Sequence, residues 1–121
     1  MALIVPFRAL RPASASAPKV ASVPYDVVNA HEAHALANGN PLSFLHVSRA
    51  EIDLPPDTDP YSEAVYTKAV ENFAALKASA PLVTEEQSSL YVYRLRMGNH
   101  VQTGVAGTFS IDEYDRGIIR K

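Results

Sequence analysis

The chain has 121 residues, 47% hydrophobic and 20% charged, which is enough for one globular domain with its own core. Its 11 Lys and Arg residues against 13 Asp and Glu residues give a net charge of -2, which argues against nucleic acid as the main partner. The chain has no cysteine, which excludes disulfides, thiolate catalysis and zinc-cysteine sites. It also has no apolar run near the ~20 residues of a membrane span, so we expect a cytoplasmic protein that binds no membrane.

The first 28 residues predict extended structure. Residues 3–7 are apolar and β-prone, which favours a short buried strand. Residues 11–18 are small and bracketed by prolines, and they predict an extended surface connection. Residues 19–23 are expected to continue it, because Pro24 keeps Val23 out of the helical region.

A short helix and a short strand are expected next. Asn29 is a good N-cap and Glu32 follows three residues later, the pattern of a capping box. The helix from Ala30 is expected to end near Gly39, which can adopt the left-handed conformation. Residues 44–47 form a brief apolar run that we interpret as a strand.

The middle of the chain predicts a loop and then a long helix. Residues 51–60 are acidic and rich in proline, which indicates a loop. Asp59 is expected to cap a helix over residues 60–79 that opens on Pro60, and Pro81 closes this unit. Apolar residues recur there at three- and four-residue steps: Val65, Tyr66, Ala69, Val70, Phe73 and Leu76.

A β-hairpin is the clearest feature of the C-terminal third. Residues 90–96 and 101–109 are rich in β-branched and aromatic residues and flank a short turn at residues 98–99. Gly104 and Gly107 in the second strand predict a bulge or a close backbone approach.

The last residues bear on domain organisation. Residues 112–115 are expected to form one helical turn, and residues 118–119 to begin a strand. A chain that stops at the start of a strand leaves backbone groups without partners. Two interpretations are equally open on this ground. In one, residues 1–121 are a single domain that forms the N-terminal portion of a longer protein. In the other, residues 118–119 pair back as an edge strand and the chain is complete.

These elements predict an α+β fold. A mainly antiparallel sheet that includes the hairpin is expected to be covered by the helix over residues 60–79 and the shorter helix from Ala30. The expected core residues are Tyr66, Val70, Phe73, Leu76, Val92 and Val105.

Metal chemistry is not expected. His31 and His34 stand at i,i+3, whereas a zinc peptidase helix needs i,i+4, so we interpret them as part of a solvated helix face. Asp53, Asp57 and Asp59 lack the central glycine and the closing glutamate of a calcium loop.

Known phosphate and nucleic-acid motifs are also missing. No glycine pattern matches the dinucleotide or P-loop fingerprints. Residues 91–96 carry tyrosines and arginines, superficially like a single-strand nucleic-acid platform. The acidic balance favours instead a strand that packs on one face and carries Arg94 and Arg96 on the other.

One cluster of polar residues remains as a candidate site. Tyr25 and Asp26 lie between an extended segment and a helix start, a place suited to binding an anion or a polar small molecule. Alternatively they fix the turn through local hydrogen bonds, and His46 is a hydrogen-bonded core residue. The candidate ligand-binding residues are Lys19, Tyr25, Asp26, His46 and Arg49.

The same residues carry a family resemblance. Residues 6–12 (PFRALRP), 19–28 (KVASVPYDVV) and 40–49 (NPLSFLHVSR) resemble the start of the domain-of-unknown-function 1015 family, and residues 91–94 and 112–121 fit it too. The family is bacterial and archaeal and is largely uncharacterised. Its members are considerably longer, so the resemblance implies that residues 1–121 are the N-terminal portion of a longer protein. The five candidate residues match its motif positions, but their roles there are not established. Ala50 stands where the family has proline.

The resemblance implies a link to serine metabolism, because many members are encoded beside serine-biosynthesis genes. The family segment Asp-Gly-His-His-Arg is similar to motifs of a ParB and sulfiredoxin-like group that includes a free-serine kinase, and it is absent here. The resemblance implies a nucleotide-dependent small-molecule enzyme, with ADP or ATP and Mg²⁺ as cofactors. Its partners would be a small-molecule ligand and the missing C-terminal part of the same protein, and this chain alone would be inactive.

Three functions stay open on the sequence. In the first, the parent protein is a small-molecule kinase, and this chain supplies one wall of its pocket. Alternatively, the chain is a non-catalytic module that binds or senses a metabolite, or it is a purely structural support.

Overall fold

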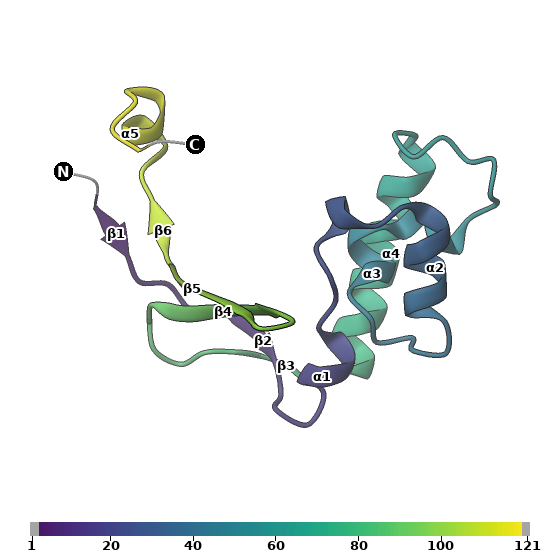
Figure 1. Cartoon of the computed structure of the whole chain (residues 1–121), viewed down its shortest axis with the longest axis horizontal. Helices are drawn as coiled ribbons and strands as arrows, with labels where there is room; N and C mark the ends of the chain where they lie inside the picture. The colour runs from purple at the N-terminus through teal and green to yellow at the C-terminus, as the bar shows by residue number, and fades with distance from the viewer. Residues whose placement is uncertain (1–2, 120–121) are drawn as a thin grey trace. The chain divides into compact units, whose positions relative to one another are not determined.

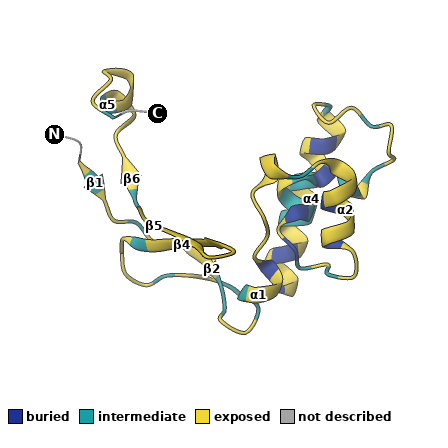
Figure 2. Ribbon diagram, viewed as in Figure 1, coloured by how far each residue is buried: buried dark blue, intermediate teal, exposed yellow. Residues whose placement is uncertain are grey.

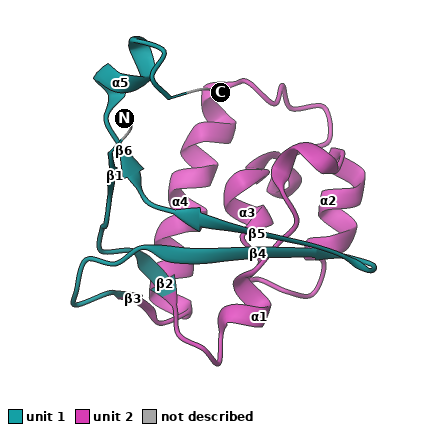
Figure 3. Cartoon of the chain, turned by 60° about the vertical axis from the view of Figure 1, so that its left-hand side comes forward, with its two compact units in different colours: residues 1–11, 84–121 teal, residues 12–83 magenta. Residues whose placement is uncertain are grey.

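The computed structural model describes residues 3–119 and divides the chain into two compact units, residues 12–83 and residues 1–11 with 84–121 (Figures 1 and 3). Helices and strands are both well represented, so the predicted α+β class is confirmed. The described strands form three separate two-stranded sheets, β1-β6, β2-β3 and β4-β5, rather than one larger sheet.

Residues 12–83 form a helical unit that contains every residue found buried in the described chain (Figure 2). One core cluster is formed by Val20, Leu76 and Ala80, and a second by the alanines of α2 with Leu45. The elements of this unit are α1 (Ala17–Val20), η1 (Tyr25–Val27), α2 (Ala30–Ala37), α3 (Leu45–Ser48), η2 (Ala50–Asp53) and α4 (Glu63–Ser79).

Helix α2 begins and ends where the sequence predicts. The Asn29 side chain accepts from the Glu32 N–H at 2.9 Å, and the Glu32 carboxylate accepts from the Asn29 N–H at 2.9 Å, which completes the capping box. Gly39 follows the helix with φ 73°. Ala33 and Ala37 are buried, so α2 packs on its small residues and is fixed in the unit.

Replacing Asn29 with alanine is expected to destabilise this unit by about 1 kcal/mol, because the backbone N–H of Glu32 loses its acceptor, the Asn29 side-chain oxygen. Urea denaturation monitored by circular dichroism would measure it. Asn29→Ser, which keeps a capping oxygen, is the matched control. Equal stability of the alanine and serine variants would contradict the role given to the cap.

Three local predictions in this unit are wrong. Residues 44–47 were expected to be a strand, but Leu45–Ser48 is helix α3, because a four-residue apolar run carries no period and Leu45 packs against α2. The expected extended segment through residues 17–20 is helix α1. Helix α4 begins at Glu63 rather than Pro60, since Asp59 holds a separate turn by accepting from the Tyr61 N–H at 2.9 Å.

The predicted core is confirmed only in part. Leu76 is buried, and Phe73 is half-buried and packs on the Leu76 cluster. Helix α4 buries the stripe that runs through Val65 and Leu76, and neighbouring positions turn about 100° away from it. The predicted core residues that are exposed instead are Tyr66, Val70, Val92 and Val105.

Residues 1–11 with 84–121 contain the predicted hairpin. Strands β4 (Tyr91–Met97) and β5 (His100–Ala106) pair antiparallel around residues 98–99, and Gly98 has φ 58°. A glycine with positive φ at the first turn position suits the right-handed twist of a hairpin. The remaining elements are β1 (Ile4–Val5), β2 (Leu10–Pro12), β3 (Leu82–Thr84), β6 (Thr108–Phe109) and α5 (Ile111–Asp115).

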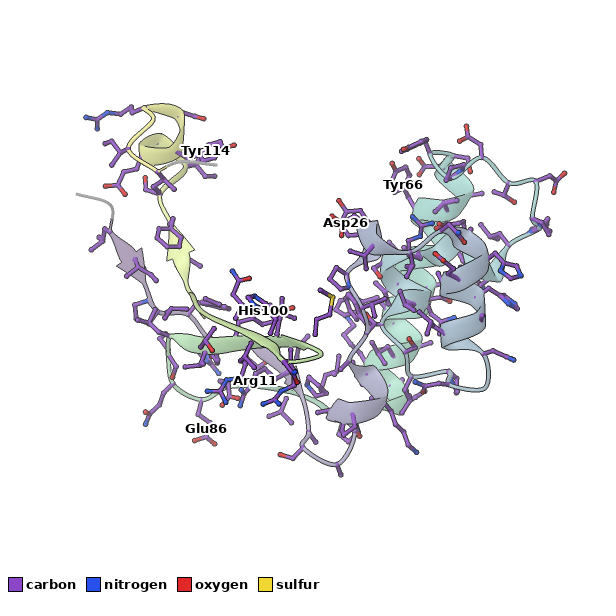
Figure 4. The ribbon with its side chains drawn as sticks, viewed as in Figure 1. Arg11, Asp26, Tyr66, Glu86, His100 and Tyr114 are labelled. Carbon is purple, nitrogen blue, oxygen red and sulfur yellow. The ribbon has the colours of Figure 1, made fainter. Side chains whose placement is uncertain are left out.

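Tyr91 fixes the N-terminal segment to the hairpin. Its hydroxyl accepts from the Ala9 N–H and donates to the Phe7 carbonyl, both at 3.0 Å. The Phe7 ring lies 5.1 Å from the Tyr91 ring, and the guanidinium carbon of Arg11, labelled in Figure 4, lies 5.4 Å from the Tyr91 ring centroid. Because residues alternate between faces along a strand, Tyr91 and Tyr93 share one face and Arg94 and Arg96 the other. The prediction that one of these faces packs is wrong, because β4 is exposed on both faces after the half-buried Tyr91.

At the end of the described chain, one of two predicted elements is present. Helix α5 confirms the helical turn expected at residues 112–115. Residues 118–119 do not form a strand, because the N–H groups of Ile118 and Ile119 both point to the Glu113 carbonyl, at 2.9 and 3.4 Å.

Candidate functional site

The larger of two neighbouring cavities in the helical unit has a volume of about 870 Å³, a size typical of small-molecule sites. Its wall comes from η1, α2, the α3–η2 segment, the loop after η2 and the first half of α4. The polar side chains that line it include Tyr25, His31, His34, Arg49, Glu51 and Tyr66.

An ion pair of Arg49 and Glu51 lies in this wall. The Arg49 Nε and Glu51 Oε1 atoms are 2.9 Å apart, and the side chains are only 23% and 13% exposed. Nε is nevertheless buried without a hydrogen bond to any described residue, because its N–H is not aimed at the carboxylate. The guanidinium therefore keeps unused donors at the cavity, and its planar fork suits a carboxylate or a phosphate.

Aromatic and apolar groups make up much of the remaining wall. Tyr25 comes from η1, Tyr61 from the turn before α4, and Tyr66 from α4 itself. All three are exposed, and Pro55 and Pro56 lie in the same wall. Such rings bury ligand area at little entropic cost and can donate a hydroxyl hydrogen bond.

His31 and His34 are both exposed, as the solvated-face interpretation predicts, and they also line the larger cavity. Within residues 3–119, neither imidazole has a hydrogen bond or an ion pair. Their i,i+3 spacing predicts that the two imidazoles lie on one helix face, but what they face depends on how η2 and the following loop fold back. Among the described residues no cluster of three or more metal-ligating side chains occurs.

A smaller cavity of about 270 Å³ is lined by His34, His46 and Asp53 among others. The Nδ1 atom of His46 lies 2.9 Å from Asp53 Oδ2, and its Nε2 lies 3.2 Å from the Asn40 carbonyl oxygen. Asn72 on α4 donates its side-chain N–H to Asp53 Oδ2 and to the His46 carbonyl, both at 2.7 Å. Both ring nitrogens of His46 therefore face acceptors, and the residue links four segments of the unit.

The structure separates the five residues that the sequence analysis grouped. Tyr25 and Arg49 line the larger cavity together, and His46 lines the smaller one. Asp26, labelled with Tyr66 in Figure 4, is exposed beside Tyr25, and its carboxylate has no hydrogen bond to the described residues. Lys19 is exposed on α1, where its carbonyl accepts from Asn40 at 2.8 Å.

The fold and the cavities thus describe an α+β protein whose helical unit contains a cavity of small-molecule size. A family model described as "Protein of unknown function (DUF1015)" matches residues 4–121, and the chain belongs to this family. Neither a curated protein nor a solved structure matches the chain. Within residues 3–119, the helices are all too short or too polar to cross a membrane.

Proposed function

We propose that residues 12–83 bind a small molecule that carries a carboxylate or a phosphate, with Arg49 as its anchor. The observation that carries this proposal is the Arg49 guanidinium, which lies in the wall of the 870 Å³ cavity and makes no hydrogen bond within residues 3–119, although its Nε atom forms an ion pair with Glu51. Largely buried donors in proteins are nearly always paired, so a guanidinium without a hydrogen bond at a cavity points to a ligand acceptor.

The finer assignment is that this site serves a small-molecule enzyme which uses ADP or ATP with Mg²⁺ and acts in serine metabolism. It is supported by the family resemblance, whereas the cavity supports the anionic ligand. The tyrosines around Arg49 suit either a nucleobase or the body of a small metabolite.

Calorimetry with ATP and ADP in Mg²⁺, serine and O-phosphoserine would test both parts. At least one anionic compound is expected to bind, and Arg49→Lys is expected to weaken it about tenfold, because lysine keeps the charge and loses the planar fork. Arg94→Lys, on the exposed hairpin, is the matched control. Equal binding by both variants, or binding of none of the four compounds, would overturn the proposal.

Turnover measured in the same samples separates the enzyme from a regulatory module. Conversion of ATP in the presence of serine is the result expected of a kinase. Arg49-dependent binding with no turnover in any form of the protein would favour a module that binds or senses a metabolite.

A further inference from the structure

The two cavities of the helical unit adjoin each other. His34 and Ile52 line both, whereas Arg49 lines only the larger and Asp53 only the smaller. Because α2 is fixed by its capping box and its buried alanines, His34 is presented from a rigid element. Its imidazole has no partner among residues 3–119, so the side chain is free to turn toward either cavity.

The short helix η2 sets the spacing between the polar groups of the two cavities. Arg49 directly precedes η2, and Asp53 is its last residue. With a rise of about 2 Å per residue, the four steps separate the two positions by roughly 8 Å of backbone. Helix η2 thus holds Arg49 and Asp53 at a fixed separation, so the two cavities have a cation and a carboxylate at opposite ends of this helix.

Asp53 can accept a further hydrogen bond. Its carboxylate accepts from His46 Nδ1 at 2.9 Å and from Asn72 Nδ2 at 2.7 Å. An ionised carboxylate offers about four lone-pair sites, so these bonds leave acceptor capacity. Since His46 and Asn72 hold the carboxylate on two sides, a ligand donor would meet an acceptor already fixed in place.

We infer that the ligand is bifunctional: its anionic group pairs with Arg49 in the larger cavity, and a hydroxyl or amine at its other end passes His34 and donates to Asp53 in the smaller one. This inference rests on the proposed function, which supplies the anionic end. It adds the ligand class, a short chain with an anion at one end and a hydrogen-bond donor at the other.

Matched pairs of simple compounds test this on the whole chain. ε-Aminocaproate and caproate share a carboxylate and a chain of similar length, but only the first carries a donor. We expect ε-aminocaproate to bind about tenfold more tightly, as one charge-assisted hydrogen bond allows. The pair β-alanine and propionate is too short to span the cavities and should show no preference.

Variants identify which acceptor is responsible. Asp53→Asn is expected to remove most of the preference for the amine, while Glu51→Gln, in the larger cavity, is expected to keep it. Because Asp53 also holds His46 and Asn72, His34→Trp serves as a second variant that narrows the passage without touching those bonds, and it should remove the preference as well.

The outcomes separate the inference from the proposed function. Arg49-dependent binding of both caproate compounds with equal affinity would overturn the inference and leave the anionic site standing. Loss of the preference in Glu51→Gln but not in Asp53→Asn would also overturn it. If neither series binds in an Arg49-dependent way, both proposals fail.

Discussion

Replacement of Arg49 by alanine is expected to destabilise the helical unit by roughly 2–4 kcal/mol, because it leaves a largely buried carboxylate without its cation. Glu51 is only 13% exposed, and the Arg49 Nε atom lies 2.9 Å from its Oε1. The penalty comes mainly from the isolated charge, since a well-formed pair in such a place contributes little net free energy. Urea denaturation followed by far-UV circular dichroism would measure the loss.

A second substitution separates this explanation from lost packing. Arg49→Ala combined with Glu51→Gln is expected to recover part of the stability, because the remaining side chain is then neutral. Arg94→Ala, on an exposed strand position, is the control for removing an arginine elsewhere. If Arg49→Ala costs no more than Arg94→Ala, or if Glu51→Gln gives no recovery, the pair is not a buried determinant of stability.

The same pair shows why the site was only partly predictable. Arg49 and Tyr25 were candidates from the sequence, and both line the larger cavity. The sequence predicts a loop at Glu51, because nothing in its local pattern says that η2 turns the side chain inward. The predicted solvated face of α2 does expose His34, but the cavity beside it is made by segments distant in sequence.

Parts of the fold that depend on neighbouring residues were predictable from the sequence, whereas parts that depend on tertiary packing were not. The Asn29 capping box and the turn at residues 98–99 depend on neighbouring residues, and both predictions are confirmed. Residues 44–47 are helical because tertiary packing of Leu45 decides what a four-residue apolar run cannot. In α4 the apolar residues span a wide arc, and only the structure shows that Val65 and Leu76 lie inside while Tyr66 does not.

Gly107 is expected to tolerate no side chain, and Gly107→Ala should destabilise the unit that holds β1 and β6 by roughly 1–3 kcal/mol. A Cβ atom placed there would lie 2.6 Å from Ile4 Cγ1, 2.8 Å from Ile4 Cδ1 and 3.0 Å from Leu90 Cδ2. The two Ile4 contacts are shorter than real Cβ atoms allow, so the Ile4 side chain would have to shift and would strain the strand in which Ile4 pairs with Phe109. The sequence predicts a bulge or a close backbone approach at Gly104 and Gly107, but the close atoms at Gly107 belong to side chains and Gly104 has no atom within 4 Å.

Amide hydrogen exchange of β1 and β6 would measure the effect where it arises, as a fall of about 5- to 150-fold in protection. Gly104→Ala, in the preceding strand β5, is the matched control, since a Cβ there meets no atom within 4 Å. Ile4→Ala in the Gly107→Ala background removes both clashing carbons and should restore part of the protection. Equal protection in the two glycine variants would show that the contact with Ile4 does not constrain the position of β1.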